Sequence, residues 1–198
     1  SDNLHTIDPG RLKYLRQILP PTGVSARPLD LFDHEMPRLF SLPVERDWGH
    51  WWIAGVVNWD DHTTETSVPL DDLGLPSGRY HVFHYWRRRY LGIVDDVVTI
   101  QQHEPHETAV LLLKPVTARP DVLTTTFHVC QGLAEIASYE FEIIDARAKI
   151  RLVLEKAGRQ FGRVFFVVPR GWRVAEAEVA GRRQAPVNES PHLVSFGL

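Results

Sequence analysis

Cysteine and methionine are almost absent from this sequence of 198 residues. The lone cysteine, Cys130, excludes an internal disulfide and any zinc site built from several cysteines. The only methionine is Met36, so Ser1 is not a translation start, and we expect the sequence to be a processed chain or a piece of a longer one. The sequence also lacks a run of about 18 apolar residues that could span a bilayer, so we expect no membrane partner.

Neither sign of charge is in large excess. Lys and Arg number 22 and Asp and Glu number 25, a net charge of -3 that argues against a nucleic-acid partner. The hydrophobic share of 43% is ordinary for a globular domain with a real core. The charge is unevenly spread, however, because residues 1–144 carry a net -8 and residues 145–198 a net +5. This change predicts a boundary between two substructures near Asp145.

One short helix is predicted near the start of the sequence, over residues 9–19. Asp8 is suited to the N-cap, and Pro9 to the first helical position, where its missing N–H costs nothing. Pro20 and Pro21 end the helix. One apolar stripe at helical spacing is formed by Leu12, Leu15, Ile18 and Leu19. A stripe of this kind needs a covering surface, either the rest of this chain or a second copy of it.

After a proline-rich loop that extends to Pro43, the apolar residues recur with a period of two, which is typical of strands. The candidate strands cover residues 51–59, 63–70, 79–86, 90–94, 97–101, 107–114, 122–130, 135–144, 149–154, 163–168, 172–179 and 193–196. We therefore predict a mainly β fold, an antiparallel β-sandwich with one short N-terminal helix. The last strands form either an extra layer or a second, smaller sandwich.

The acidic residues give little support for catalysis. Two-carboxylate hydrolysis needs acids that converge from different elements, whereas the acids here stand as neighbours at turns, in Asp60-Asp61, Asp71-Asp72 and Asp95-Asp96. The motifs of a serine nucleophile and of a phosphate-binding loop are missing, and Cys130 lies in an apolar stretch. We expect no catalytic residue and no cofactor in this chain.

Histidine spacing raises an alternative. His103 and His106 flank a Pro turn and could converge on a metal ion, whereas His81 and His84 point to opposite faces of a strand. Two ligands fall short of the usual three or four, so we expect no metal. A complete small enzyme with a histidine-based site at His103 and His106 stays open as an alternative.

Four tryptophans lie within twelve residues: Trp48, Trp51, Trp52 and Trp59. Flat indole faces are the surfaces on which sugar-binding modules stack pyranose rings, but large aromatic residues of a sandwich also fill cores. Trp51 and Trp52 must point to opposite faces of their strand. Trp48, Trp51 and Trp52 are thus the candidate sugar-stacking residues, with core packing as the alternative.

Several motifs together resemble the region after the catalytic barrel in α-galactosidase-like glycoside hydrolases of clan D, families 27 and 36. In chain order they are Ser1-Asp2-x-Leu4, Arg11-Leu12-x-x-Leu15-Arg16-x-x-Leu19-Pro20, Ala26-Arg27-Pro28-Leu29-Asp30-Leu31-Phe32, Val56-Val57-Asn58-Trp59, Asp72-Leu73-Gly74-Leu75, the stretch from Tyr80 to Trp86, Tyr90-Leu91-Gly92 and Pro105-His106-Glu107. The resemblance covers about residues 1–132, and its specificity lies in the fixed order of these motifs.

The resemblance implies a parent enzyme that hydrolyses α-galactosides with retention, using two Asp residues at the ends of barrel strands upstream of Ser1. Asp2 matches an acid at the end of the eighth barrel strand, which borders the substrate pocket and is neither catalytic carboxylate. Residues 1–20 would then be a helix remnant of the barrel, residues 21–138 the β-sandwich domain, and residues 139–198 the additional strands.

The sequence thus predicts a non-catalytic C-terminal β-sandwich that stabilises the barrel of the same polypeptide, its main expected partner. Carbohydrate and a second copy of the chain are further expected partners. The alternative function is a carbohydrate-binding module that uses Trp48, Trp51 or Trp52.

Overall fold

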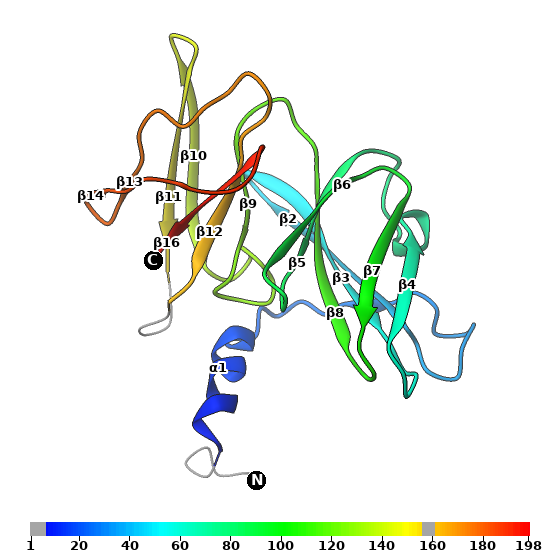
Figure 1. The fold of residues 1–198 in the computed structure, drawn as a ribbon. Helices are drawn as coiled ribbons and strands as arrows, with labels where there is room; N and C mark the ends of the chain where they lie inside the picture. The colour runs from blue at the N-terminus through cyan, green and yellow to red at the C-terminus, as the bar shows by residue number, and fades with distance from the viewer. Residues whose placement is uncertain (1–6, 156–160) are drawn as a thin grey trace. The chain divides into compact units, whose positions relative to one another are not determined.

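Strands dominate the computed structural model, which describes residues 7–155 and 161–198 (Figure 1). The fold is mainly β, with several antiparallel sheets and one short N-terminal helix, as the sequence predicts. The elements are α1 (Pro9–Ile18), β1 (Arg27–Pro28), β2 (Leu39–Arg46), β3 (Gly49–Val57), β4 (Thr64–Pro69), the 3-10 helix η2 (Asp71–Leu73), β5 (Tyr80–His84), β6 (Arg89–Val94), β7 (Val97–His103), β8 (Thr108–Pro115), β9 (Asp121–Thr125), β10 (Ile136–Ile144), β11 (Arg147–Leu154), β12 (Arg163–Val167), β13 (Glu178–Val179), β14 (Arg182–Arg183), β15 (Val187–Ser190) and β16 (Leu193–Gly197).

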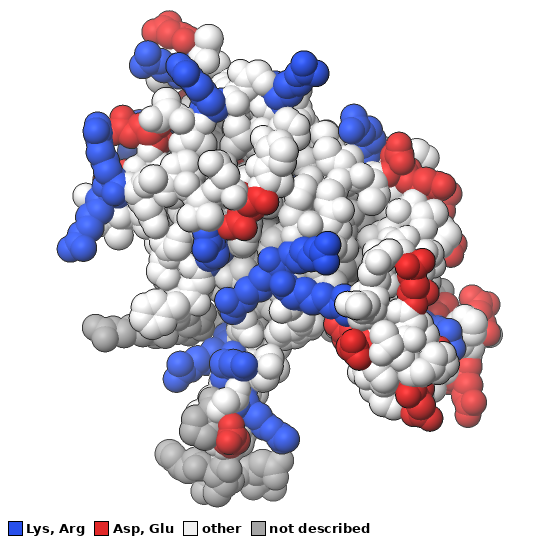
Figure 2. Space-filling model, in the orientation of Figure 1, with Lys and Arg blue, Asp and Glu red and all other residues white. Residues whose placement is uncertain are grey.

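The chain divides into two compact units. The central unit is Val24–Leu123, and the terminal unit joins Ser1–Gly23 to Thr124–Leu198. Counted along the sequence, the central unit carries a net charge of -6 and the terminal unit +3. In Figure 2, acidic side chains gather over the part of the central unit where Figure 1 places β4 and β7. The boundaries between the units lie after Gly23 and Leu123, whereas the sequence predicts domain boundaries after residues 20 and 138. That residues 21–138 form one sandwich domain stays a prediction.

Helix α1 begins as its sequence predicts. The Asp8 carboxylate caps it by accepting a hydrogen bond of 2.6 Å from the Gly10 N–H, and proline occupies the first turn. The helix ends at Ile18, one residue earlier than predicted, where Leu19 turns to an extended conformation. In the described part of the chain, no helix has the length and hydropathy that crossing a membrane requires.

Two sheets of the central unit share one core. The larger sheet has the order β1-β2-β3-β8-β5-β6, and the smaller one pairs β4 with β7. Alternate residues of the strands point inward from both sheets. The core consists of Ala54, Val56, Val68, Leu70, Leu73, Leu75, Tyr80, Val82, Val98, Ile100, Ala109, Leu111 and Leu113. The period of two in the sequence therefore marks one buried face on each strand.

Strand β2 corrects the expectation of a proline-rich loop through Pro43. It pairs with β3 along its whole length, from Leu39 opposite Val56 to Arg46 opposite Gly49. Proline is tolerated in a strand where its missing N–H faces no neighbour. On its other side β2 pairs only at Phe40 and Ser41, with β1, so Pro43 lies where β2 is an edge strand.

Short antiparallel strand pairs build the terminal unit. Strand β16 pairs with both β12 and β15, β10 pairs with β11, and β13 pairs with β14. The turn between β10 and β11 consists of Asp145 and Ala146, both with positive φ (48° and 60°), as a two-residue hairpin turn requires.

Two strand predictions in this unit are wrong in their extent. The strand predicted over 122–130 ends at Thr125, and the one predicted over 172–179 is reduced to Glu178 and Val179. After Thr125 the backbone turns, and Thr126 bonds the first residue of β12 through both its side chain and its backbone. Its Oγ1 accepts a hydrogen bond of 2.9 Å from the Arg163 N–H, and its N–H donates to the Arg163 carbonyl at 3.0 Å. Strand β15 was not predicted at all.

Candidate functional site

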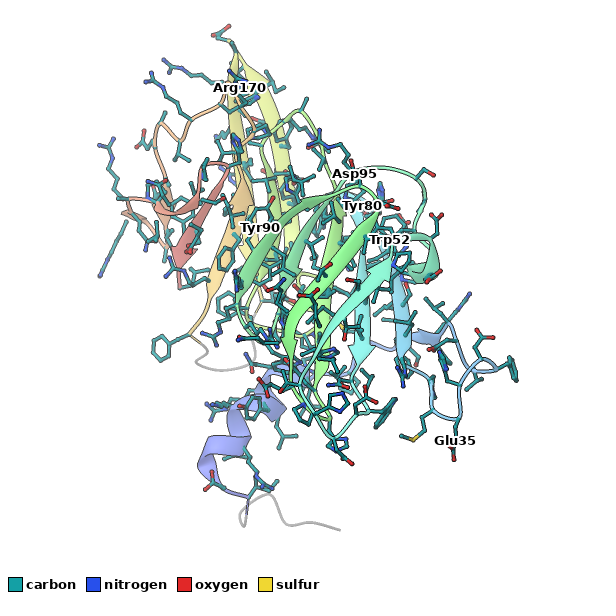
Figure 3. All side chains as sticks on the ribbon, turned by 45° about the vertical axis from the view of Figure 1, so that its right-hand side comes forward. Glu35, Trp52, Tyr80, Tyr90, Asp95 and Arg170 are labelled. Carbon is teal, nitrogen blue, oxygen red and sulfur yellow. The ribbon has the colours of Figure 1, made fainter. Side chains whose placement is uncertain are left out.

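Trp51 is buried, with 2% of its surface exposed, and lies on β3. The Trp48 ring stacks on it at 5.0 Å between centroids and an angle of 25°. Trp52 points to the opposite face, where its ring meets Tyr80 edge to face at 5.8 Å beside the core (Figure 3). Each of the three candidate sugar-stacking rings therefore packs on another aromatic ring.

Lys114 is a buried cation beside this cluster. Its Nζ lies 2.8 Å from Asp121 Oδ2, donates a hydrogen bond of 2.6 Å to the Val122 carbonyl and sits 5.5 Å from the centre of the Trp48 ring. Burial lowers the pKa of Lys114, and the adjacent Asp121 charge opposes that shift. The Trp48 indole thus contacts both the Lys114 ammonium and the Trp51 ring. These contacts favour the packing alternative for the cluster. Sugar stacking by Trp48, Trp51 or Trp52 stays a prediction.

His103 and His106 do not converge. His103 is fully buried: its Nε2 donates to the Glu107 carbonyl at 3.1 Å, and its Nδ1 lies 2.9 Å from the Thr66 hydroxyl, so both ring nitrogens are engaged. His106 is exposed, and its Nε2 lies 3.1 Å from Asp61 Oδ1. Among the described residues, no three or more His, Cys, Asp or Glu are placed to hold a metal ion.

A second ionic network, partly exposed to solvent, joins the β5–β6 hairpin to the turn before β8, and sequence reasoning missed it. Arg87 Nη2 lies 2.7 Å from Glu107 Oε2, which also accepts from the Glu104 N–H at 3.0 Å. Burial would raise the pKa of Glu107, but the hydrogen bonds from Arg87 and Glu104 and the Arg87 charge bring it below its usual value. Glu107 stands in the motif Pro105-His106-Glu107, which was the signal available in the sequence.

His84 lies at the centre of this network, almost fully buried. Its Nε2 is 3.9 Å from Glu107 Oε1, and the Arg87 N–H approaches its Nδ1 at 3.4 Å. Burial, and then the Arg87 charge, lower the pKa of His84 to about 4, although the Glu107 charge acts in the opposite direction. The ring is therefore neutral at physiological pH and serves packing.

His84 makes stability depend on pH. The unfolded imidazole takes up a proton near pH 6.5, whereas the folded one stays neutral down to about pH 4, so the unfolded state binds more protons between these values. We expect the free energy of unfolding to fall by about 1–2 kcal/mol because of this residue when the pH is lowered from 6.5 to about 4. Urea unfolding at a series of pH values measures this. In His84→Gln this fall of the free energy of unfolding at low pH should disappear. A variant with the same pH dependence as the unsubstituted chain would contradict the role given to His84.

The terminal unit fixes the end of α1. The Val129 N–H donates to the Gln17 carbonyl at 2.7 Å, and His128 Nε2 lies 3.1 Å from the Pro20 carbonyl. Leu12 and Leu15 of the apolar stripe are half-buried, whereas Ile18 and Leu19 remain 44% and 48% exposed. The stripe is thus partly covered by this chain itself, and association with a second copy stays a prediction.

Asp2 lies outside the described residues, so its predicted place at a substrate pocket stays a prediction.

The loop between β1 and β2 carries an aromatic side chain that is almost fully exposed: 96% of the surface of Phe32 faces solvent. The loop is held by Asp30, whose buried carboxylate accepts from the Arg38 N–H at 2.9 Å and the Leu39 N–H at 3.1 Å. Figure 3 shows the loop, with Glu35 at its outer side, extending away from the strands of the central unit. A fixed backbone therefore presents an apolar side chain to solvent.

Comparison with known proteins gave matches among solved structures, whereas no protein-family model and no curated protein matched the sequence. The structures of a family 27 β-L-arabinopyranosidase from Geobacillus stearothermophilus, as wild type and as a variant in complex with arabinose, match at a TM-score of 0.37 and 19% identity. They cover 48% and 47% of this chain and 20% of theirs. α-Galactosidase I from Mortierella vinacea matches at a TM-score of 0.35 and 16% identity, over 44% of this chain and 22% of that chain.

The matched part is therefore about a fifth of each of these longer chains. The comparisons thus give a partial structural match to α-galactosidase-like enzymes of glycoside hydrolase family 27.

Proposed function

We propose that this chain is a non-catalytic C-terminal β domain of an α-galactosidase-like glycoside hydrolase, and that it stabilises the catalytic barrel of the same polypeptide. The observation that carries the proposal is the fixed, exposed loop at Phe32. Leu31 and Met36 of the same loop are about half exposed. An apolar surface that the fold holds out to solvent is typical of a contact with another protein surface.

Three ionisable groups of the central unit support a scaffold role, because each is engaged by another protein group. Lys114 is paired with Asp121, Glu107 with Arg87, and His103 is bonded through both ring nitrogens. Such fully engaged groups brace strands and turns, whereas a catalytic acid or base needs access to a substrate.

The partner follows from the sequence resemblance, in which the sandwich covers one side of the barrel. Phe32 itself belongs to the motif from Ala26 to Phe32, one of those that carry the resemblance. The proposal therefore assigns the loop to the contact with the barrel.

The experiment is thermal inactivation of the full-length polypeptide carrying Phe32→Glu. A charge at a buried apolar contact is costly, so this variant should lose α-galactoside hydrolysis faster on heating than the unsubstituted enzyme.

A further inference from the structure

Trp59 follows β3 and differs from the other tryptophans of its cluster, because 37% of its surface is exposed. Its Nε1–H donates a hydrogen bond of 3.0 Å to the Pro37 carbonyl. That bond ties one edge of the indole to the backbone, so the ring is held in place while part of it faces solvent. A fixed, exposed indole is a stacking platform.

Polar side chains surround this platform through a closed circuit of contacts. Pro37, which holds the Trp59 ring, is followed by Arg38, and Arg38 Nη2 lies 3.9 Å from Asp60 Oδ1. Asp60 in turn follows Trp59 directly. The circuit thus joins a guanidinium and a carboxylate to the two backbone segments that carry and hold the indole. Asp61, the next residue, brings a second carboxylate, which lies 3.1 Å from His106 Nε2.

Asn58 holds the backbone beneath these side chains. Its buried side-chain amide accepts from the Asp60 N–H at 3.0 Å and donates to the carbonyls of His62, His103 and Glu104 at 3.1, 2.9 and 3.0 Å. One side chain thus joins the turn after β3 to the turn after β7. The platform and its polar neighbours therefore rest on a preformed support, which lowers the entropic cost of binding.

The polar groups are open to a ligand. The side chains of Arg38, Asp60, Asp61 and His106 are between 40% and 97% exposed. They supply exposed hydrogen-bond donors and acceptors in the segments that carry and hold Trp59. Trp51, by contrast, is buried, and the Trp48 ring contacts Trp51 and Lys114.

We propose that Trp59, with Arg38, Asp60, Asp61 and His106, forms a carbohydrate-binding site that takes a pyranose ring. The apolar C–H face of the sugar stacks on the exposed indole, as apolar and aromatic surfaces prefer. Its hydroxyl groups, each both donor and acceptor, bond the guanidinium and the carboxylates, which form the stronger charge-assisted hydrogen bonds. A galactopyranose suits this arrangement because its axial 4-hydroxyl leaves a continuous row of C–H groups on the opposite face.

The test is titration of the 198-residue chain with methyl α-D-galactopyranoside, followed by the NMR signal of the Trp59 indole N–H and by saturation transfer to the sugar. Trp59→Ala identifies the indole signal by its disappearance. We expect a saturable response of the unsubstituted chain in the millimolar range, with saturation transfer strongest at the ring C–H groups. Glycerol, which carries hydroxyl groups but has no pyranose face, should give no response.

Two kinds of variant test the assignment. Trp59→Ala should weaken binding at least about tenfold, which corresponds to about 1.4 kcal/mol, and Arg38→Gln, which leaves the platform in place, should weaken it as well. Phe32→Ala is the matched control, because it removes an exposed aromatic ring that takes no part in the circuit of contacts at Trp59, and it should bind the sugar unchanged. Circular dichroism verifies that each variant is folded.

Three results would overturn the proposal. The first is the lack of any saturable response in the unsubstituted chain, and the second is binding that persists in folded Trp59→Ala. The third is a change of the mass in solution between the unsubstituted chain and folded Trp59→Ala, which would make this surface a protein contact.

Discussion

Asp121→Asn is expected to lower the free energy of unfolding by about 3–5 kcal/mol, because it leaves the Lys114 ammonium buried without a counter-charge. The two side chains are each 6% exposed, and their charged atoms lie 2.8 Å apart. Asparagine keeps the shape of the side chain and an oxygen for the hydrogen bond from the Val122 N–H, but its NH2 group replaces the Oδ2 that pairs with Lys114. The loss would therefore report the missing charge together with the missing acceptor for the ammonium. Urea unfolding followed by circular dichroism measures it.

The double variant Lys114→Met, Asp121→Asn is the control. Replacing a buried ion pair by uncharged groups of similar volume is often close to neutral, so this variant should recover most of the lost stability. The penalty of the single variant should also shrink as the pH rises, because the unpaired Lys114 has a lowered pKa when folded and the unfolded state then binds more protons. A single variant as stable as the unsubstituted chain would contradict the assignment.

Trp51→Ala is expected to cost about 3–5 kcal/mol, the usual price of removing a large aromatic side chain from a core. Trp51 lies under Trp48, which in turn contacts Lys114, so the cavity would open beneath the buried cation as well. Thermal and urea unfolding of the same variant measure the loss.

Phe32→Ala is the matched control for Trp51→Ala, since its ring is almost fully exposed and its removal should change stability by less than about 0.5 kcal/mol. Retention on an immobilised galactoside provides a second readout. A folded Trp51→Ala of unchanged stability that loses this retention would favour the sugar-binding alternative for the buried cluster.

Local signals in the sequence were sufficient for much of the fold. The cap at Asp8 and the proline after it set the start of α1. The period of two identified most strands of the central unit, because each buries one face in a shared core. These features depend on neighbours along the chain and are therefore readable without the tertiary structure.

Features that depend on a distant partner were not readable. Pro43 argued against a strand, but β2 accepts it because its partner β1 is only two residues long. The alternation over residues 172–179 suggested a strand, but only Glu178 and Val179 pair with another strand. Pairing of this kind is a tertiary property.

The candidate site shows the same division. The sequence marked the tryptophan cluster but could not choose between packing and sugar stacking, because that choice depends on burial. It gave no sign that Lys114 would pair with Asp121 beside Trp48, since the residues that meet there come from separate strands and a turn. It also raised the convergence of His103 and His106 on a metal ion. In the structure both ring nitrogens of His103 are engaged by Thr66 and Glu107, and the backbone turns at His106 with a positive φ of 56°, so the two rings do not converge.

The half-life of hydrolytic activity on heating, in the full-length polypeptide with and without Phe32→Glu, tests the proposed scaffold role most directly. The account predicts a half-life several-fold shorter in the variant, whereas the same substitution in the 198-residue chain should change its unfolding free energy by less than about 0.5 kcal/mol, since Phe32 is exposed there. Equal half-lives of the two full-length enzymes would contradict the account.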